Sequence, residues 1–153
     1  MRRTLTLLLL VAGLVVSGCG DDNGGNGGGG GEASKPEVEV PDGPPPLELQ
    51  IKDLKVGTGA EAVAGKKVTV HYVGVSYSDK EQFDASWDAG APFPFTLGAG
   101  EVIQGWDEGV AGMKVGGRRQ LIIPPALAYR EFGQGKIKPN ETLVFVVDLL
   151  DVA

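Results

Sequence analysis

The sequence predicts an α+β domain in which a strongly twisted antiparallel β-sheet wraps around one short α-helix. Three observations lead to this class. Alternating apolar and polar residues, the period of half-buried strands, recur after residue 46. One stretch instead has apolar residues at helical spacing, and several strands accompanied by a single helix favour an antiparallel sheet. The residues after Pro46 suffice for one hydrophobic core, so we expect one domain over 47–153.

The first residues have the pattern of a secretion signal. Two arginines precede an apolar run over 5–16 that is too short to span a bilayer comfortably. The run ends in Val16-Ser17-Gly18-Cys19, which resembles the bacterial lipobox, where a cysteine receives lipid. Cys19 is the only cysteine, so an intrachain disulfide is excluded. We expect a lipoprotein signal peptide over 1–18 and a lipid anchor on Cys19; the alternative is an incidental thiol within a signal peptide.

Residues 19–46 have the composition of a tether. They consist mostly of Gly, Asp, Asn, Glu and Pro, including Gly27 to Gly31 and the run Pro44-Pro45-Pro46. A segment with so little apolar surface cannot offset the entropy lost on ordering, so we predict disorder. Loss of residues 1–18 removes two arginines and moves the formal charge from −6 to −8. Such an acidic chain is not expected to bind nucleic acid or anionic lipid through charge.

The predicted strands differ in how their side chains alternate. Residues 47–52 alternate as a half-buried strand does, and the β-branched run over 68–77 argues for a longer one. Further alternating sets occupy 93–97 and 119–123, the latter stopped by two prolines. Residues 142–152 are apolar on both faces for much of their length, which predicts an interior strand.

The predicted helix has about three turns and lies within the stretch 100–113. Its apolar stripe consists of Ile103, Trp106, Val110 and Met113. Trp106 falls near the helix start, where its ring can form the floor of a pocket. Glycines over 112–117 end the helix, and residues 130–141 are rich in turn formers, which predicts a long loop of the kind that often carries function.

The residue types argue against hydrolytic and metal chemistry. The single histidine, His71, lies in an alternating strand without a second metal ligand nearby, so we expect no metal and no cofactor. No Gly-x-Ser-x-Gly motif or phosphate-binding loop is present. The concentration of aromatic and aliphatic residues instead predicts an apolar pocket. A dry pocket suits rotation about an Xaa-Pro bond, because the planar amide is more polar than the twisted one.

Seven short motifs occur in an order that resembles the FK506-binding-protein (FKBP) type of peptidyl-prolyl cis-trans isomerase. The match covers roughly residues 47 to 153, and the motifs are Val70-His71-Tyr72-Val73-Gly74, Phe83-Asp84-Ala85-Ser86, Pro92-Phe93-Pro94-Phe95, Leu97-Gly98, Glu101-Val102-Ile103-Gln104-Gly105-Trp106, Ala128-Tyr129 and Thr142-Leu143-Val144-Phe145. The resemblance implies the twisted sheet wrapped around a helix and an enzyme that accelerates isomerisation of Xaa-Pro bonds.

The resemblance also implies roles for individual residues. The catalytic roles fall on Tyr72, Asp84, Ile103, Trp106 and Tyr129. The walls that bind substrate are Phe83, Phe93, Val102, Ile137 and Phe145, although Phe83 also fits a core position. Ala89 stands where the family often has an arginine that pairs with the aspartate, so Asp84 must find another partner.

The implied partners are proline-containing polypeptides and macrolides of the FK506 or rapamycin kind. We expect a monomer in the bacterial cell envelope, lipid-anchored to a membrane and facing the periplasm or the outside, that acts on exported proteins. The alternative is a module of the same fold that binds proline-containing segments, as a chaperone or docking site, with little turnover.

Overall fold

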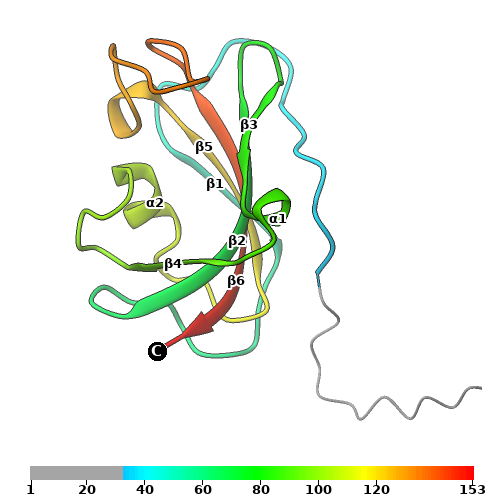
Figure 1. The fold of residues 1–153 in the computed structure, drawn as a ribbon, viewed down its shortest axis with the longest axis vertical. Coiled ribbons are helices and arrows are strands. Elements are labelled where there is room, and N and C mark those ends of the chain that lie inside the picture. The colour runs from blue at the N-terminus through cyan, green and yellow to red at the C-terminus, as the bar shows by residue number, and fades with distance from the viewer. Residues whose placement is uncertain (1–32) are drawn as a thin grey trace, which may run out of the picture.

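The computed structural model describes residues 33–153. Its elements, in chain order, are β1 (Gln50–Lys55), β2 (Lys67–Ser76), β3 (Gln82–Ala85), α1 (Ser86–Ala89), β4 (Phe93–Thr96), α2 (Gln104–Gly109), β5 (Arg118–Ile123), a 3-10 turn (Pro125–Leu127) and β6 (Leu143–Val152). All strand pairs are antiparallel, in the order β1-β5-β6-β2-β3, and β4 also pairs with β2. This open, twisted six-stranded sheet with few helices (Figure 1) confirms the predicted class.

The predictions for residues 1–18, for Cys19 and for the rest of the tether up to residue 32 lie outside the described residues. Within residues 33–153, no helix combines the length and the apolar character that a membrane crossing requires.

Strand β6 forms the middle of the sheet. It pairs with β2 on one side and β5 on the other, and every residue from Leu143 to Leu149 is buried. Because both faces of the strand are covered, its sequence is apolar on both faces, and the prediction of an interior strand is confirmed. The one charged residue in this buried run, Asp148, is paired with Arg118 of β5, whose Nε lies 2.7 Å from its Oδ1.

Helix α2 lies on the inner face of the curved sheet (Figure 1) and approaches β5 closely. A Cβ atom at Gly105 would lie 2.4 Å from Cγ2 of Ile123, so only glycine permits this distance. Trp106, Val110 and Met113 are buried in the main core, as their spacing predicts. The helix thereby seats Trp106 between the sheet and the loops that follow β4.

The helix is shorter than the sequence predicts. The apolar spacing predicts about three turns within 100–113, but α2 has six residues. Ile103 precedes it in an extended conformation (φ −59°, ψ 148°), and Gly112 follows with φ +86°. The N–H of Gly112 donates to the carbonyl of Ala62 at 2.9 Å, so tertiary hydrogen bonding turns the chain where the apolar spacing alone would continue the helix.

The first strand also differs from its prediction. It begins at Gln50 rather than at Leu47, and all of its residues are exposed. Leu47 is 93 % exposed and Ile51 48 %, so the prediction of a half-buried strand is wrong. The reason is that β1 is an edge strand, hydrogen-bonded only to β5, with a register shift between Asp53 and Lys55.

Residues 33–46, the described part of the predicted tether, contain no helix or strand but contact the outer face of the sheet. Val38 and Val40 pack against a cluster made of Val75, Tyr77, Ile122 and Val144. The Tyr77 hydroxyl lies 3.1 Å from the carbonyl oxygen of Pro41, and Gln120 Nε2 donates to the carbonyl of Glu39 at 2.6 Å. We call residues 33–46 the N-terminal arm; the sequence did not predict these contacts.

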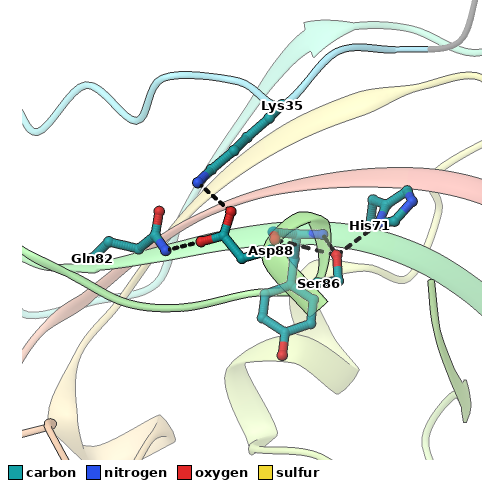
Figure 2. A network of polar contacts seen from close by, with 6 residues as sticks. Lys35, His71, Gln82, Ser86 and Asp88 are labelled. Atoms are coloured by element: carbon teal, nitrogen blue, oxygen red, sulfur yellow. Dashed lines mark hydrogen bonds and ion pairs between the residues drawn. The ribbon is translucent and has the colours of Figure 1, made fainter. Parts of the chain in front are cut away.

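The arm also reaches α1. Figure 2 shows Lys35 beside Asp88, whose carboxylate accepts a hydrogen bond from Lys35 Nζ at 2.7 Å and one from Gln82 Nε2 at 2.6 Å. Both groups of the ion pair are substantially exposed, so it contributes little to stability. It does place the arm beside α1, whose Asp88 also contacts Gln82 of β3.

Candidate active site

An open cleft of about 420 Å³ lies between the start of α2, strands β2 to β4 and the loop after the 3-10 turn. The ten residues assigned to the site from the sequence all line it: Tyr72, Phe83, Asp84, Phe93, Val102, Ile103, Trp106, Tyr129, Ile137 and Phe145. Four lining residues were not predicted, namely Glu101, Gln134, Gly135 and Lys136. Glu101 lies within one of the quoted motifs, and the other three lie in the loop 130–141 that the sequence predicts to carry function, so these two patterns are the signals that could have found them.

Aromatic side chains form the floor of the cleft. Trp106 is only 4 % exposed, and the rings of Tyr72 and Phe145 meet it edge-on, with ring centroids 4.9 and 5.2 Å away. The ring of Phe93 lies 6.1 Å away, also edge-on. Such edge-to-face pairs are favourable beyond the area that they bury, so they fix the orientation of the indole. The floor is therefore flat, apolar and rigid.

The polar edge of the cleft is built from Tyr72 and Asp84. The Tyr72 hydroxyl donates to Asp84 Oδ2 at 2.6 Å. Tyr72 is therefore the partner of Asp84 in this chain, which has Ala89 where the family often has an arginine. Burial raises the pKa of the Tyr72 phenol, and the hydrogen bond to Asp84 and the charge of that carboxylate raise it further. Burial also raises the pKa of Tyr129, with a smaller contribution from the charge of Asp84. Both phenols are therefore protonated donors at neutral pH.

Ile103 and Tyr129 each bring to the cleft a hydrogen-bond donor that has no acceptor in the described part of the chain. The backbone N–H of Ile103, just before α2, has no acceptor among residues 33–153, and neither does the Tyr129 hydroxyl. The segment that carries Ile103 is held from both sides, because Asp107 accepts from the N–H of Gly98 at 2.8 Å and Glu101 accepts from the N–H of Thr96 at 2.7 Å. The backbone N–H of Ile103 is thus held in place and can donate a hydrogen bond to a ligand carbonyl.

His71 does not line the cleft. Its ring stacks on Trp87 with centroids 4.1 Å apart, and Nδ1 lies 2.8 Å from Ser86 Oγ. Figure 2 shows the contact between His71 and Ser86, the first residue of α1. Ser86 Oγ also accepts the backbone N–H of Tyr72 at 2.7 Å, so this buried hydroxyl positions the strand that carries Tyr72. Within residues 33–153 no group of histidine, cysteine and carboxylate side chains could hold a metal ion.

The arrangement can bind a small apolar ring and two carbonyl groups. It has no nucleophile paired with a base, because His71 faces Ser86 away from the cleft and Asp84 contacts Tyr72. What remains is an apolar, aromatic floor with hydrogen-bond donors at its edge, which is suited to stabilising one conformation of an amide over another.

Comparisons with known proteins place these motifs in one family. The family model of FKBP-type peptidyl-prolyl cis-trans isomerases matches residues 59–150. The chain is 62 % identical over 120 residues to an FK506-binding protein of Streptomyces anulatus, which covers 77 % of this chain and 97 % of that protein. It is 53 % identical over 116 residues to a probable FK506-binding protein of Corynebacterium glutamicum, with 76 % of this chain and 97 % of that protein covered.

Solved structures agree with the sequence comparisons. The crystal structure of AtFKBP13 is similar with a TM-score of 0.64 at 39 % identity, over 69 % of this chain and 93 % of that one. The crystal structure of FkpA from Escherichia coli is similar with a TM-score of 0.63 at 38 % identity, over 77 % of this chain and 52 % of that one.

Proposed function

We propose that this chain, which belongs to the FKBP-type peptidyl-prolyl cis-trans isomerase family, uses the cleft above Trp106 to accelerate Xaa-Pro isomerisation in exported proteins. The isomerase activity itself follows from the family and from the high identity to FK506-binding proteins. The family binds proline-containing substrates and FK506-like ligands. The residue roles, the exported clients and the membrane anchor are the proposal.

The observation that carries the proposed mechanism is the aromatic, apolar floor of the cleft. Rotation about the Xaa-Pro bond has a barrier of about 18–20 kcal/mol, because the amide gives up its resonance at the halfway twist. The planar amide carries more charge separation than the twisted one, so replacing water by the rings around Trp106 disfavours the planar form relative to the twisted form. This differential effect lowers the barrier without a proton transfer or a covalent step.

Each cleft residue then has a defined part. The prolyl ring lies on Trp106, between the rings of Tyr72 and Phe93. The free donors described above, the N–H of Ile103 and the hydroxyl of Tyr129, hold the carbonyl oxygens on either side of the proline. Asp84, fixed by Tyr72, orients the twisted amide at the cleft edge.

The chain offers a matched pair of variants for testing this mechanism. It has two tryptophans, Trp106 on the cleft floor and Trp87 stacked on His71 outside the cleft. We expect Trp106→Leu to lower kcat/KM on a Leu-Pro peptide by about tenfold or more, which corresponds to about 1.4 kcal/mol of lost transition-state stabilisation. Trp87→Leu should retain most of the activity. The assay is a protease-coupled measurement of cis-to-trans conversion.

Two outcomes would contradict the mechanism. Equal losses of kcat/KM in Trp106→Leu and Trp87→Leu would mean that the cleft floor does not contribute specifically to catalysis. A wild-type rate no better than the uncatalysed background at micromolar protein, with proline peptides still bound, would favour the non-catalytic binding module.

The membrane anchor is proposed from the first residues alone. The positive start, the apolar run and the Val16-Ser17-Gly18-Cys19 motif support export followed by lipidation. We expect Cys19→Ala to move the protein out of the membrane fraction, while Ser17→Ala, which keeps the thiol, leaves it there. Retention of the Cys19→Ala protein in washed membranes would overturn lipidation as the anchor.

A further inference from the structure

We propose that Phe132, outside the cleft, is a second contact for the client chain, one that packs against an apolar side chain of an unfolded polypeptide whose proline occupies the cleft. The inference rests on the proposed function, because the cleft defines the client. It concerns the segment 130–137, which we call the rim loop.

Phe132 is far more exposed than the other phenylalanines. It is 79 % exposed, whereas Phe93 on the cleft wall is 38 % exposed and Phe95 and Phe145 are buried. Phe83 is partly buried against the core. A single exposed apolar side chain needs no explanation by itself. The position of Phe132, rather than its exposure, is what indicates a binding function.

The rim loop continues the cleft on both sides of Phe132. Tyr129 precedes it and the segment 134–137 follows it, and all of these residues line the cleft. The backbone N–H groups of Phe132 and Gly133 donate to the carbonyl of Tyr129, each at 3.2 Å. The backbone of Phe132 is therefore attached directly to a cleft residue, and its exposed side chain lies on a segment that borders the cleft.

The rim loop is also braced, so the aromatic ring is presented from a fixed backbone. Gln134 and Ile137 exchange both of their backbone hydrogen bonds, at 2.9 and 2.8 Å. The N–H of Asn140 donates to the carbonyl of Arg130 at 2.7 Å, which closes the base of the loop. Ile137 is buried in the main core. A ring held this way loses little conformational freedom when a ligand covers it.

An unfolded polypeptide is the occupant that fits this position. An extended chain rises about 3.3 Å per residue, so residues a few positions from a bound proline extend beyond the mouth of the cleft. Unfolded clients expose apolar side chains that folded proteins bury. Arg130 and Glu131, the neighbours of Phe132 in the chain, carry opposite charges, so the charges next to the ring offset one another.

The test compares a short and a long substrate on the full chain. We expect Phe132→Ser to lower kcat/KM for a disulfide-free protein whose refolding is limited by Xaa-Pro isomerisation by about five- to tenfold, the effect of losing partial burial of one phenylalanine. It should leave kcat/KM for a Leu-Pro tetrapeptide unchanged. Phe132→Leu should restore most of the activity on the protein. Leu47→Ser, which removes an even more exposed apolar side chain outside the cleft, is the matched control and should change neither.

Several outcomes would overturn the inference. An equal loss on both substrates would mean that the variant damages the cleft. No loss on the protein substrate, or an equal loss in Leu47→Ser, would mean that Phe132 makes no specific client contact. A smaller elution volume for the wild type than for Phe132→Ser would assign the side chain to contact with a second copy. Failure of the wild type on the tetrapeptide would instead refute the proposed function.

Discussion

Replacing Tyr72 by phenylalanine removes the hydroxyl that donates to Asp84 at 2.6 Å but keeps the ring that meets Trp106 edge-on at 4.9 Å. A hydrogen bond to a charged group contributes about 1.5–3 kcal/mol. Asp84 is exposed, so water replaces the lost donor and the effect is smaller. We therefore expect a coupling of about 1 kcal/mol between the two residues in transition-state stabilisation, about fivefold in kcat/KM.

A double-mutant cycle measures this coupling directly. The variants are Tyr72→Phe, Asp84→Ala and the combination, assayed for kcat/KM on a Leu-Pro peptide. Once one partner is missing, removal of the other should cost about fivefold less than it does in the wild type. Tyr77→Phe is the control, because the Tyr77 hydroxyl contacts the arm at Pro41 and should combine additively with Asp84→Ala. Additive losses for Tyr72 and Asp84 would refute the view that the tyrosine fixes the carboxylate.

Three further predictions concern stability. The free energy of unfolding should fall as the pH rises above about 10, since burial raises the pKa of Tyr72 and Tyr129 and the unfolded chain loses these protons first. The free energy of unfolding should fall by less than about 1.4 kcal/mol per pH unit for each group, because both rings are only partly buried. Urea unfolding at several pH values should show a shallower decline for Tyr72→Phe than for the wild type. An unchanged slope of stability against pH would exclude Tyr72 as a cause of the decline. Gly105→Ala should destabilise the protein by about 1–3 kcal/mol, because the new methyl group meets Ile123. In the Gly105→Ala background, Ile123→Ala should lower the free energy of unfolding by less than it does alone. A Gly105→Ala protein as stable as the wild type in urea would contradict the close approach of α2 to β5. Val40→Asp should lower the thermal midpoint because it places a charge against the outer apolar cluster, and a midpoint equal to that of the wild type would mean that the arm does not contribute to stability.

The parts of the fold that could be predicted are those in which burial alone determines the residue types. Strand β6 is covered on both faces, so its continuous apolar run indicates its interior place. The residues assigned to the cleft from motifs separated by as many as 73 positions, from Tyr72 to Phe145, lie on one cavity, because the motif order follows a fixed topology. Their catalytic roles stay predictions.

The parts that could not be predicted depend on contacts between distant segments. A half-buried strand and the exposed edge strand β1 can have the same alternation of apolar and polar residues, as residues 47–52 do. The alternation does not show how many neighbouring strands pair with a segment. The helix ends early because Ala62 accepts the N–H of Gly112. Strand β3 is only four residues long and has an irregular register with β2, so it leaves no alternation to recognise.

The order in which segments attach to the sheet determines how the domain responds to mechanical force. The arm and β1 come first in the chain, and both lie outside the cleft, the arm on the outer face and β1 at an edge. A pull applied from the N-terminal side is therefore borne first by side-chain contacts and then by a single ladder to β5. Strands β2 and β3, which carry Tyr72 and Asp84, follow β1 in the chain and are loaded only after β1 has detached. The leading segments can peel away while the walls that hold a proline stay assembled.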